Sequence, residues 1–133
     1  MKPRAALRIL VVDDEIEMAS MIAEELADRG YSVVALASPT EALERLKDEP
    51  FDALITDLSM PHVDGIGLLR MSRALDPSRP VIVITGHAAI DIAIEASAYG
   101  AFHYLSKPFS LVRLVELVDA ALHVGESHGY TAP

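Results

Sequence analysis

The fold of this chain is decided at one stretch, Ile55-Thr-Asp-Leu-Ser-Met-Pro-His-Val-Asp-Gly65. An apolar run over residues 51–56 has the length and composition of a buried strand, and Pro61 and Gly65 mark the loop that follows it. Asp57 therefore stands at the carboxyl end of a predicted strand. Because ligands of open α/β sheets bind outside that end of the strands, Asp57 is the first candidate functional residue.

Strand-like and helix-like segments alternate five times along the chain. Each apolar run of strand length is followed by a longer segment with helical periodicity. The runs begin near Leu7, Tyr31, Phe51, Pro80 and Ala101. Because each return to a parallel strand needs a crossover, the alternation predicts an α/β fold, a doubly wound (βα)5 parallel sheet with helices on both faces.

Composition indicates which strands are central. Residues 9–12, 53–56 and 81–85 are almost continuously apolar, as expected of strands covered on both faces. Residues 101–106 alternate more between apolar and polar side chains, which favours an edge strand, whereas residues 31–37 leave both positions open. The sheet is therefore expected to have three buried strands at its centre.

Local signals predict where the helices begin and end. Asp14 lies at the turn into a first helix over about residues 15–29, which Gly30 terminates. The sequence Ser38-Pro39-Thr40-Glu41 is typical of a capping box and opens a second helix that ends near Asp48. Three more helices are expected over residues 65–75, over residues 88–99 and after the capping residue Ser110. The last of them has one apolar face, made of Leu111, Leu114, Val115, Val118 and Leu122.

Length and composition bound the function. The 133 residues are expected to form one domain over residues 7–123, with residues 1–6 as an N-terminal extension and residues 124–133 as a flexible tail or the start of a linker. A net charge of −9 disfavours direct binding to nucleic acid or to an anionic membrane. The absence of cysteine excludes disulfides and thiolate chemistry. The apolar run after the basic N-terminus ends at Asp13, so no targeting or spanning segment is predicted and we expect a cytoplasmic protein.

The carboxyl ends of the predicted strands carry complementary polar residues. Asp13 and Asp14 follow the first strand, Asp57 the third and Lys107 the fifth, while Thr85 ends the fourth. The second strand ends without a charge. This pattern predicts the flavodoxin-like strand order 2-1-3-4-5, because its switch point lies between the first and third strands. Three acids, a hydroxyl and a lysine would then face one crevice.

The acids of this crevice require a cation. Two carboxylates about 5 Å apart repel by roughly 3 kcal/mol at an effective dielectric of about 20. Three acids (Asp13, Asp14, Asp57) and one lysine (Lys107) leave a formal charge of −2, which a divalent ion would cancel. Oxygen ligands favour Mg2+, which stays partly hydrated and accepts phosphate oxygens. Asp57 is then the candidate nucleophile toward a phosphoryl group, and Thr85 a donor to its oxygens.

Four motifs gather at these strand ends. They are Asp13-Asp14-Glu15, Asp57-Leu-Ser-Met-Pro61 with Asp64-Gly65, Thr85-Gly-His-Ala88 and Tyr104-Leu-Ser-Lys-Pro-Phe109. Their joint spacing, from Leu7 to about His123, resembles the receiver domain of bacterial two-component response regulators. The resemblance implies a signalling switch rather than a turnover enzyme, one that assists its own phosphorylation and dephosphorylation.

The resemblance also implies a role for the acidic residues. Asp57 is expected to accept a phosphoryl group from a sensor histidine kinase or a histidine phosphotransfer protein. Asp14 and Asp57 are expected to bind Mg2+ directly, together with the backbone carbonyl of Ser59. Asp13 is expected to act on the ion largely through water.

The resemblance also implies which residues carry out the conformational switch and which affect the rate of dephosphorylation. Lys107 is expected to contact the phosphoryl group, and the peptide bond after it to be cis. Thr85 and Tyr104 form the implied switch pair, which repacks the surface made by the fourth helix, fifth strand and fifth helix. That surface is expected to bind an output domain or partner protein and to form a homodimer on phosphorylation. Ser59 and His87 occupy positions that tune dephosphorylation in receivers.

The predicted fourth helix has a wide apolar sector. Its members are Ile90, Ile92, Ala93, Ile94, Ala96 and Tyr99. Two interpretations stay open for it: a deeply packed helix, or a partner or dimer surface that is exposed or reshaped on phosphorylation.

Two other classes of function stay open. A phosphohydrolase of the haloacid dehalogenase type also has a nucleophilic aspartate after a strand, but it normally has an acid two residues later, where this chain has Ser59. A degenerate receiver that acts as a constitutive binding module is the other class. The intact set of Asp14, Asp57, Thr85 and Lys107 argues against it.

Overall fold

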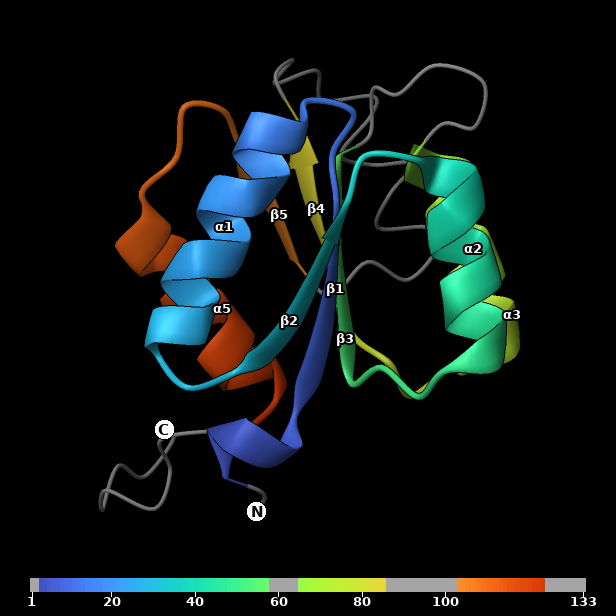
Figure 1. Ribbon diagram of the computed structural model, residues 1–133, viewed down its shortest axis with the longest axis horizontal. Coiled ribbons are helices and arrows are strands. Elements are labelled where there is room, and N and C mark those ends of the chain that lie inside the picture. Colours follow the sequence, from blue (N-terminus) through green and yellow to red (C-terminus); the bar gives the residue numbers. More distant parts are fainter. Residues whose placement is uncertain (1–2, 58–64, 86–102, 124–133) are drawn as a thin grey trace.

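The computed structural model describes residues 3–57, 65–85 and 103–123 as a parallel sheet covered by helices (Figure 1). The strands are β1 (Arg8–Val12), β2 (Ser32–Leu36), β3 (Ala53–Asp57), β4 (Val81–Thr85) and β5 (His103–Ser106). The helices are the short 3-10 helix η1 (Arg4–Ala6) and α1 (Ile16–Asp28), α2 (Pro39–Asp48), α3 (Gly65–Leu75) and α5 (Leu111–Ala121). Figure 1 shows α1 and α5 on one face of the sheet, and α2 and α3 on the other.

The strand order is β2-β1-β3-β4-β5, with every pair parallel, which confirms the predicted order. The chain leaves β1 for β2 on one side and returns to β3 on the other, so the order reverses between β1 and β3. Loops at a reversal of this kind diverge and leave a crevice at the carboxyl edge of the sheet. The fold therefore places its natural binding site where the first and third strands end, at the top of Figure 1.

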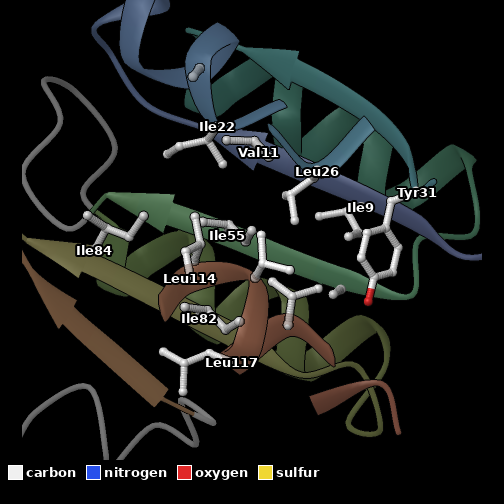
Figure 2. Close-up of a cluster of buried hydrophobic side chains, with 14 of the residues drawn as sticks. Ile9, Val11, Ile22, Leu26, Tyr31, Ile55, Ile82, Ile84, Leu114 and Leu117 are labelled. Carbon is white, nitrogen blue, oxygen red and sulfur yellow. The ribbon is translucent and has the colours of Figure 1, made fainter. Parts of the chain in front are cut away.

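Two apolar clusters hold the layers together. The first lies between the sheet and helices α1 and α5, and Figure 2 shows its labelled side chains, such as Ile9, Ile55 and Leu114, gathered between the strands and these helices. The second lies between the sheet and helices α2 and α3 and includes Leu54 and Leu68. Each fully buried side chain of this size contributes about 1.5–3 kcal/mol relative to exposure.

The burial of each strand agrees with the position in the sheet that its composition predicts. All residues of β3 and β4 are buried, as are all residues of β1 after Arg8, so the three central strands are those predicted. In β5, half-buried and exposed residues alternate, which confirms it as an edge. The open question about β2 is answered by its place at the other end of the sheet, where three of its five residues are only half-buried.

The predicted helix caps are largely confirmed. The Ser38 hydroxyl accepts from the Glu41 N–H at 3.2 Å, with Pro39 at the first helical position of α2. The Ser110 hydroxyl accepts from the Arg113 N–H at 3.2 Å at the start of α5. After α1, Gly30 adopts a positive φ of 105°, a conformation that a glycine allows without strain.

Two details of the helices differ from expectation. The first helix, expected over about residues 15–29, spans Ile16–Asp28 with Glu15 and Arg29 as its capping residues, and the Asp13 side chain accepts the Glu15 N–H at its start. In α5, Leu117 is buried although it was not assigned to the apolar face, whereas Leu111 and Leu122 are only partly buried. The helix is therefore covered over a broader arc than a single stripe, because it packs against α1 and against the strand residues of the first apolar cluster.

The predicted fourth helix over residues 88–99, with its wide apolar sector, lies outside the described residues. The same holds for Ser59 and His87. Among the helices that the structure does describe, none has the length and apolar character needed to cross a membrane.

Candidate functional site

Three carboxylates converge at the carboxyl edge of the sheet. Asp57 is the last residue of β3 and is 4% exposed, Asp13 follows β1 directly and is 2% exposed, and Asp14 beside it is exposed. One carboxylate oxygen from each of the three lies within 4.8 Å of those of the other two. The strand order thus brings together residues from two neighbouring strands that are more than 40 positions apart in the chain.

The start of α1 fixes the orientation of Asp13. The Asp13 backbone N–H donates to the Leu36 carbonyl at 3.2 Å, which ties the residue to the end of β2. Its Oδ1 accepts from the Glu15 N–H at 2.9 Å, at the positive end of the helix dipole. Asp13 therefore has one oxygen bound to the helix end and the other directed to the crevice.

Lys107 supplies the positive charge of the site. It follows β5, and its backbone N–H donates to the Thr85 carbonyl at 2.7 Å. Its Nζ lies 3.2 Å from Asp13 Oδ2 and 3.2 Å from Asp57 Oδ2. One ammonium group therefore bridges both buried carboxylates. The resemblance implied a contact between Asp13 and the ion through water, whereas a direct contact between Asp13 and Lys107 was not foreseen.

Burial and charge shift the pKa values in this cluster. Burial raises the pKa of Asp13, with a smaller contribution from the Asp57 charge, and the hydrogen bonds from Glu15 and Lys107 offset only part of that rise. For Lys107 burial alone would lower the pKa, but the hydrogen bonds to Asp57 and Asp13 and the charges of the two acids outweigh it and raise the pKa. The raised pKa of Lys107 favours its charged form, whereas the raised pKa of Asp13 means that burial disfavours the charged form of that carboxylate.

Thr85 and Tyr104 lie on the neighbouring strands β4 and β5. Thr85 ends β4 and is buried, 4% exposed. Tyr104 pairs in register with Val83, two residues before Thr85, so both side chains belong to the same face of the sheet. The Tyr104 side chain is 45% exposed. The two members of the predicted switch pair thus sit on one face with one of them turned to the solvent.

The site brings together most of the residues that the sequence singled out. Asp13, Asp14, Asp57 and Lys107 meet within hydrogen-bonding or ligand distance, and Thr85 is joined to Lys107 through its carbonyl. The Lys107–Pro108 peptide bond is cis, as predicted. Sequence reasoning missed the Glu15 N–H that orients Asp13, although an aspartate two residues before the N-cap of a helix is a recognisable signal for such a bond.

The donor set of the three acids fits a hard divalent ion. All three donors are carboxylate oxygens, and the three acids with Lys107 retain a formal charge of −2. Neither a cysteine nor a histidine belongs to this group, which disfavours the softer transition metals. Mg2+ commonly binds to one or two carboxylates and keeps the remaining positions for water and phosphate oxygens.

Comparison with known proteins identifies the family to which this fold belongs. A family model described as the response regulator receiver domain matches residues 9–119. An NtrX-like response regulator of Rickettsia felis is 38% identical over 120 residues, which are 89% of this chain and 25% of that protein. The C4-dicarboxylate transport transcriptional regulatory protein DctD of Rhizobium meliloti is 38% identical over 112 residues, 84% of this chain and 24% of that protein. The chain thus spans about a quarter of the length of these relatives.

Solved structures give the same answer. A response regulator receiver domain from Clostridium thermocellum superimposes with a TM-score of 0.83 and 35% identity, covering 88% of this chain and 94% of the other. The beryllofluoride-activated receiver domain dimer of NtrC4 superimposes with a TM-score of 0.82 and 34% identity, covering 87% of this chain and 96% of the other. The haloacid dehalogenase interpretation is therefore dropped. By sequence and by fold, the chain belongs to the response regulator receiver domains, the signalling switches of two-component systems.

Proposed function

We propose that Asp57 is the phosphoacceptor of this receiver domain, and that a sensor histidine kinase or a histidine phosphotransfer protein supplies the phosphoryl group. The observation that carries the proposal is the position of the Asp57 carboxylate, buried at a strand end, 3.2 Å from the Lys107 ammonium and grouped with two further acids. A carboxylate held this way is a competent nucleophile at phosphorus.

The chemistry of transfer follows from these contacts. An Asp57 carboxylate oxygen forms the new bond to phosphorus while the bond from phosphorus to the imidazole nitrogen of the donor breaks. Lys107, already 3.2 Å from the Asp57 carboxylate, then lies beside the transferred group and stabilises the negative charge on its oxygens. Thr85, whose carbonyl holds the Lys107 backbone, is the hydroxyl donor to that group.

We assign the Mg2+ ligands to Asp14, Asp57 and the backbone carbonyl of Ser59, with Asp13 acting through water. The cluster of three acids and its residual charge of −2 support the assignment. When bound, Mg2+ offsets that charge and stabilises the phosphoryl oxygens. The chain's own part is to hold the three carboxylates together at a cost, so that the site is attractive to a cation before any donor arrives.

The switch that follows phosphorylation is assigned to Thr85 and Tyr104. The Thr85 hydroxyl moves toward the phosphoryl group, and Tyr104, 45% exposed in this structure, turns inward. The surface of β5 and α5, together with the predicted fourth helix, then changes shape and binds an output domain, a partner protein or a second copy of the chain. The exposed Tyr104 and Val112 support this assignment, because they are large apolar groups on that surface.

The remaining assignments concern the bounds of the domain, its output and location, and the lifetime of its phosphorylated state. Residues 7–123 form the receiver domain, residues 1–6 an N-terminal extension and residues 124–133 a tail or linker. Relatives named as transcriptional regulatory proteins, such as DctD, favour an output in transcription and hence a cytoplasmic location. Ser59 and His87 set the lifetime of the phosphorylated state, and the domain assists both its own phosphorylation and its own dephosphorylation.

One experiment tests the proposal. The protein is incubated with Mg2+ and acetyl phosphate or phosphoramidate, and intact mass reports the adduct. We expect one phosphoryl group per chain, stable in acid and labile in base, which is absent from Asp57→Asn. Without an adduct in the wild-type protein, the degenerate binding module becomes the better interpretation. Rapid multiple turnover of acetyl phosphate would instead indicate a hydrolase.

A further inference from the structure

Helix α5 is held to the domain body by apolar contacts along one side. Its buried residues are Leu114, Val115, Leu117 and Val118. Figure 2 shows Leu114 and Leu117 against the strand residues of the first apolar cluster. Apolar burial is strong but non-directional, so these contacts constrain the distance of α5 from the sheet more than its position along its own axis.

A polar cluster at the amino edge of the sheet, opposite the acidic site, gives α5 directional contacts with the rest of the domain. Both Asp119 oxygens are engaged: Oδ2 accepts from Arg4 Nη2 at 2.7 Å, and Oδ1 accepts from Arg4 Nε at 3.3 Å and from the Tyr31 hydroxyl. The Arg4 guanidinium also lies 5.7 Å from the centroid of the Tyr31 ring. We call Arg4, Tyr31 and Asp119 the Asp119 clasp. It joins η1, the residue that precedes β2 and the last turn of α5.

The clasp is distinctive among the contacts of α5. Within the described part of the chain, Asp119 makes the only side-chain polar contacts between α5 and another element. The other ion pair of the helix, Arg113 with Glu116, lies within α5 itself. Burial and the Asp119 hydrogen bond raise the pKa of Tyr31, so the hydroxyl stays protonated as a donor at neutral pH.

The other end of α5 leads directly to the acidic site. Three residues separate Lys107 from Leu111, where the helix begins, and Ser110 caps that first turn. Asp119 lies eight residues further, about 12 Å along the helix axis. A movement of α5 along its axis therefore pulls on the segment that carries Lys107, whose ammonium contacts Asp57.

We propose that the Asp119 clasp is a positioning device for Lys107. By fixing the C-terminal end of α5, it sets how Lys107 is presented to Asp57, and so the rate at which Asp57 takes up a phosphoryl group. The inference rests on the proposed function of Asp57 and extends it to residues at the opposite edge of the sheet. One of them, Arg4, precedes the region that matches the receiver family, residues 9–119.

The first test measures the rate of Asp57 phosphorylation by acetyl phosphate as a function of Mg2+ concentration. Arg4→Ala and Asp119→Asn are expected to lower the plateau rate about fivefold, the lower end of measured couplings between sites. The half-saturating Mg2+ concentration should stay unchanged, because the proposed ion ligands are not moved. The double variant should be no slower than the slower single variant, since both changes open the same clasp.

The matched control is Arg29→Ala, which removes a different arginine–carboxylate pair, Arg29 with Glu25 at 3.0 Å, in which no residue of α5 takes part. It should leave the plateau rate unchanged. If Arg4→Ala and Asp119→Asn lower the unfolding temperature but keep the wild-type plateau rate, the clasp is only structural and the inference is wrong.

A second test does not depend on phosphorylation. Urea midpoints are compared for Asp119→Asn, Lys107→Met and the double variant, without acetyl phosphate. Because the two residues are far apart, unlinked changes should add. A non-additive midpoint supports the link through α5, and an additive one overturns it. If the wild-type protein forms no adduct, the proposed function fails, while this test still decides whether the Asp119 clasp and Lys107 are coupled through α5.

Discussion

The two edges of the sheet differ in how their charged side chains are paired. At the carboxyl edge, Asp13 and Asp57 are buried and share one ammonium, that of Lys107, while Asp14 adds a further negative charge. At the amino edge, arginines are paired with carboxylates, and Glu49 pairs with two of them, Arg8 and Arg45. Arg4 binds Asp119 at 2.7 Å, and Arg8 binds Glu49 at 2.8 Å.

The amino edge also contains a buried arginine, Arg79, whose guanidinium has both hydrogen-bond acceptors and a nearby carboxylate. Arg79 is 6% exposed, donates to the Phe51 carbonyl and to the Ser72 hydroxyl, each at 3.0 Å, and lies 4.0 Å from Asp76. The contrast shows that buried charged side chains serve different purposes at the two edges of one sheet. Paired charges stabilise the amino edge, whereas the excess of carboxylates over the Lys107 ammonium among the described residues makes the carboxyl edge attractive to a cation.

The largest effect is expected from removing the shared cation of the carboxyl edge. Lys107→Met should lower the rate of Asp57 phosphorylation by acetyl phosphate about 10²-fold, because one preorganised donor to the transferring oxygens is lost. The initial rate of adduct formation at saturating Mg2+ measures it. Lys47→Met, an exposed lysine on α2, serves as the control and should keep the wild-type rate.

At the amino edge, outside the Asp119 clasp, the same kind of change should affect stability instead. Arg79→Met leaves the Phe51 carbonyl and the buried Ser72 hydroxyl without their donor, which should lower the free energy of unfolding by about 3 kcal/mol. Urea unfolding followed by circular dichroism measures it. Arg73→Met, an exposed arginine on α3, should change it by less than about 0.5 kcal/mol. A phosphorylation defect in folded Arg79→Met would contradict this prediction, which limits the influence of the amino edge on Asp57 to the Asp119 clasp.

Mg2+ should stabilise the folded protein through the carboxyl edge alone. At ten times its dissociation constant, the ion should raise the free energy of unfolding by about 1.4 kcal/mol. Asp14→Asn should lose most of this gain, because a proposed ligand is removed. Urea midpoints with Mg2+ and with NaCl of equal ionic strength separate binding from screening. Equal gains in wild type and Asp14→Asn would argue against the assigned ligands.

The smallest effect concerns pH at the amino edge. Arg45, and then Arg8, lower the pKa of Glu49 from 4.5 to about 2 through hydrogen bonds. A lowered pKa means that the contribution of Glu49 to stability is present above pH 4.5 and is lost as the pH falls toward 2. Glu49→Gln should therefore have a lower urea midpoint than wild type at pH 6, with the difference shrinking below pH 4.5. Glu44→Gln on the exposed side of α2 should show no such trend.

The sequence by itself determined the sheet and the members of the acidic site. Apolar runs, turn residues and caps act over a few neighbouring positions, so the five strands, the order of the sheet and the capping by Ser38 and Ser110 could be predicted. Parallel strands place their carboxyl ends at one edge, so the meeting of Asp13, Asp57 and Lys107 followed from strand order.

Only the tertiary structure decided how these groups are paired. Arg4 and Asp119 lie 115 positions apart, and Phe51 and Arg79 lie 28 apart. No periodicity of the chain relates such residues, because their contact depends on how the ends of strands and helices are packed. The direct hydrogen bond from Lys107 to Asp13 is another contact that depends on packing and that the sequence did not predict. Local patterns thus specify which groups reach an edge of the sheet, and packing specifies which of them meet there and with what charge.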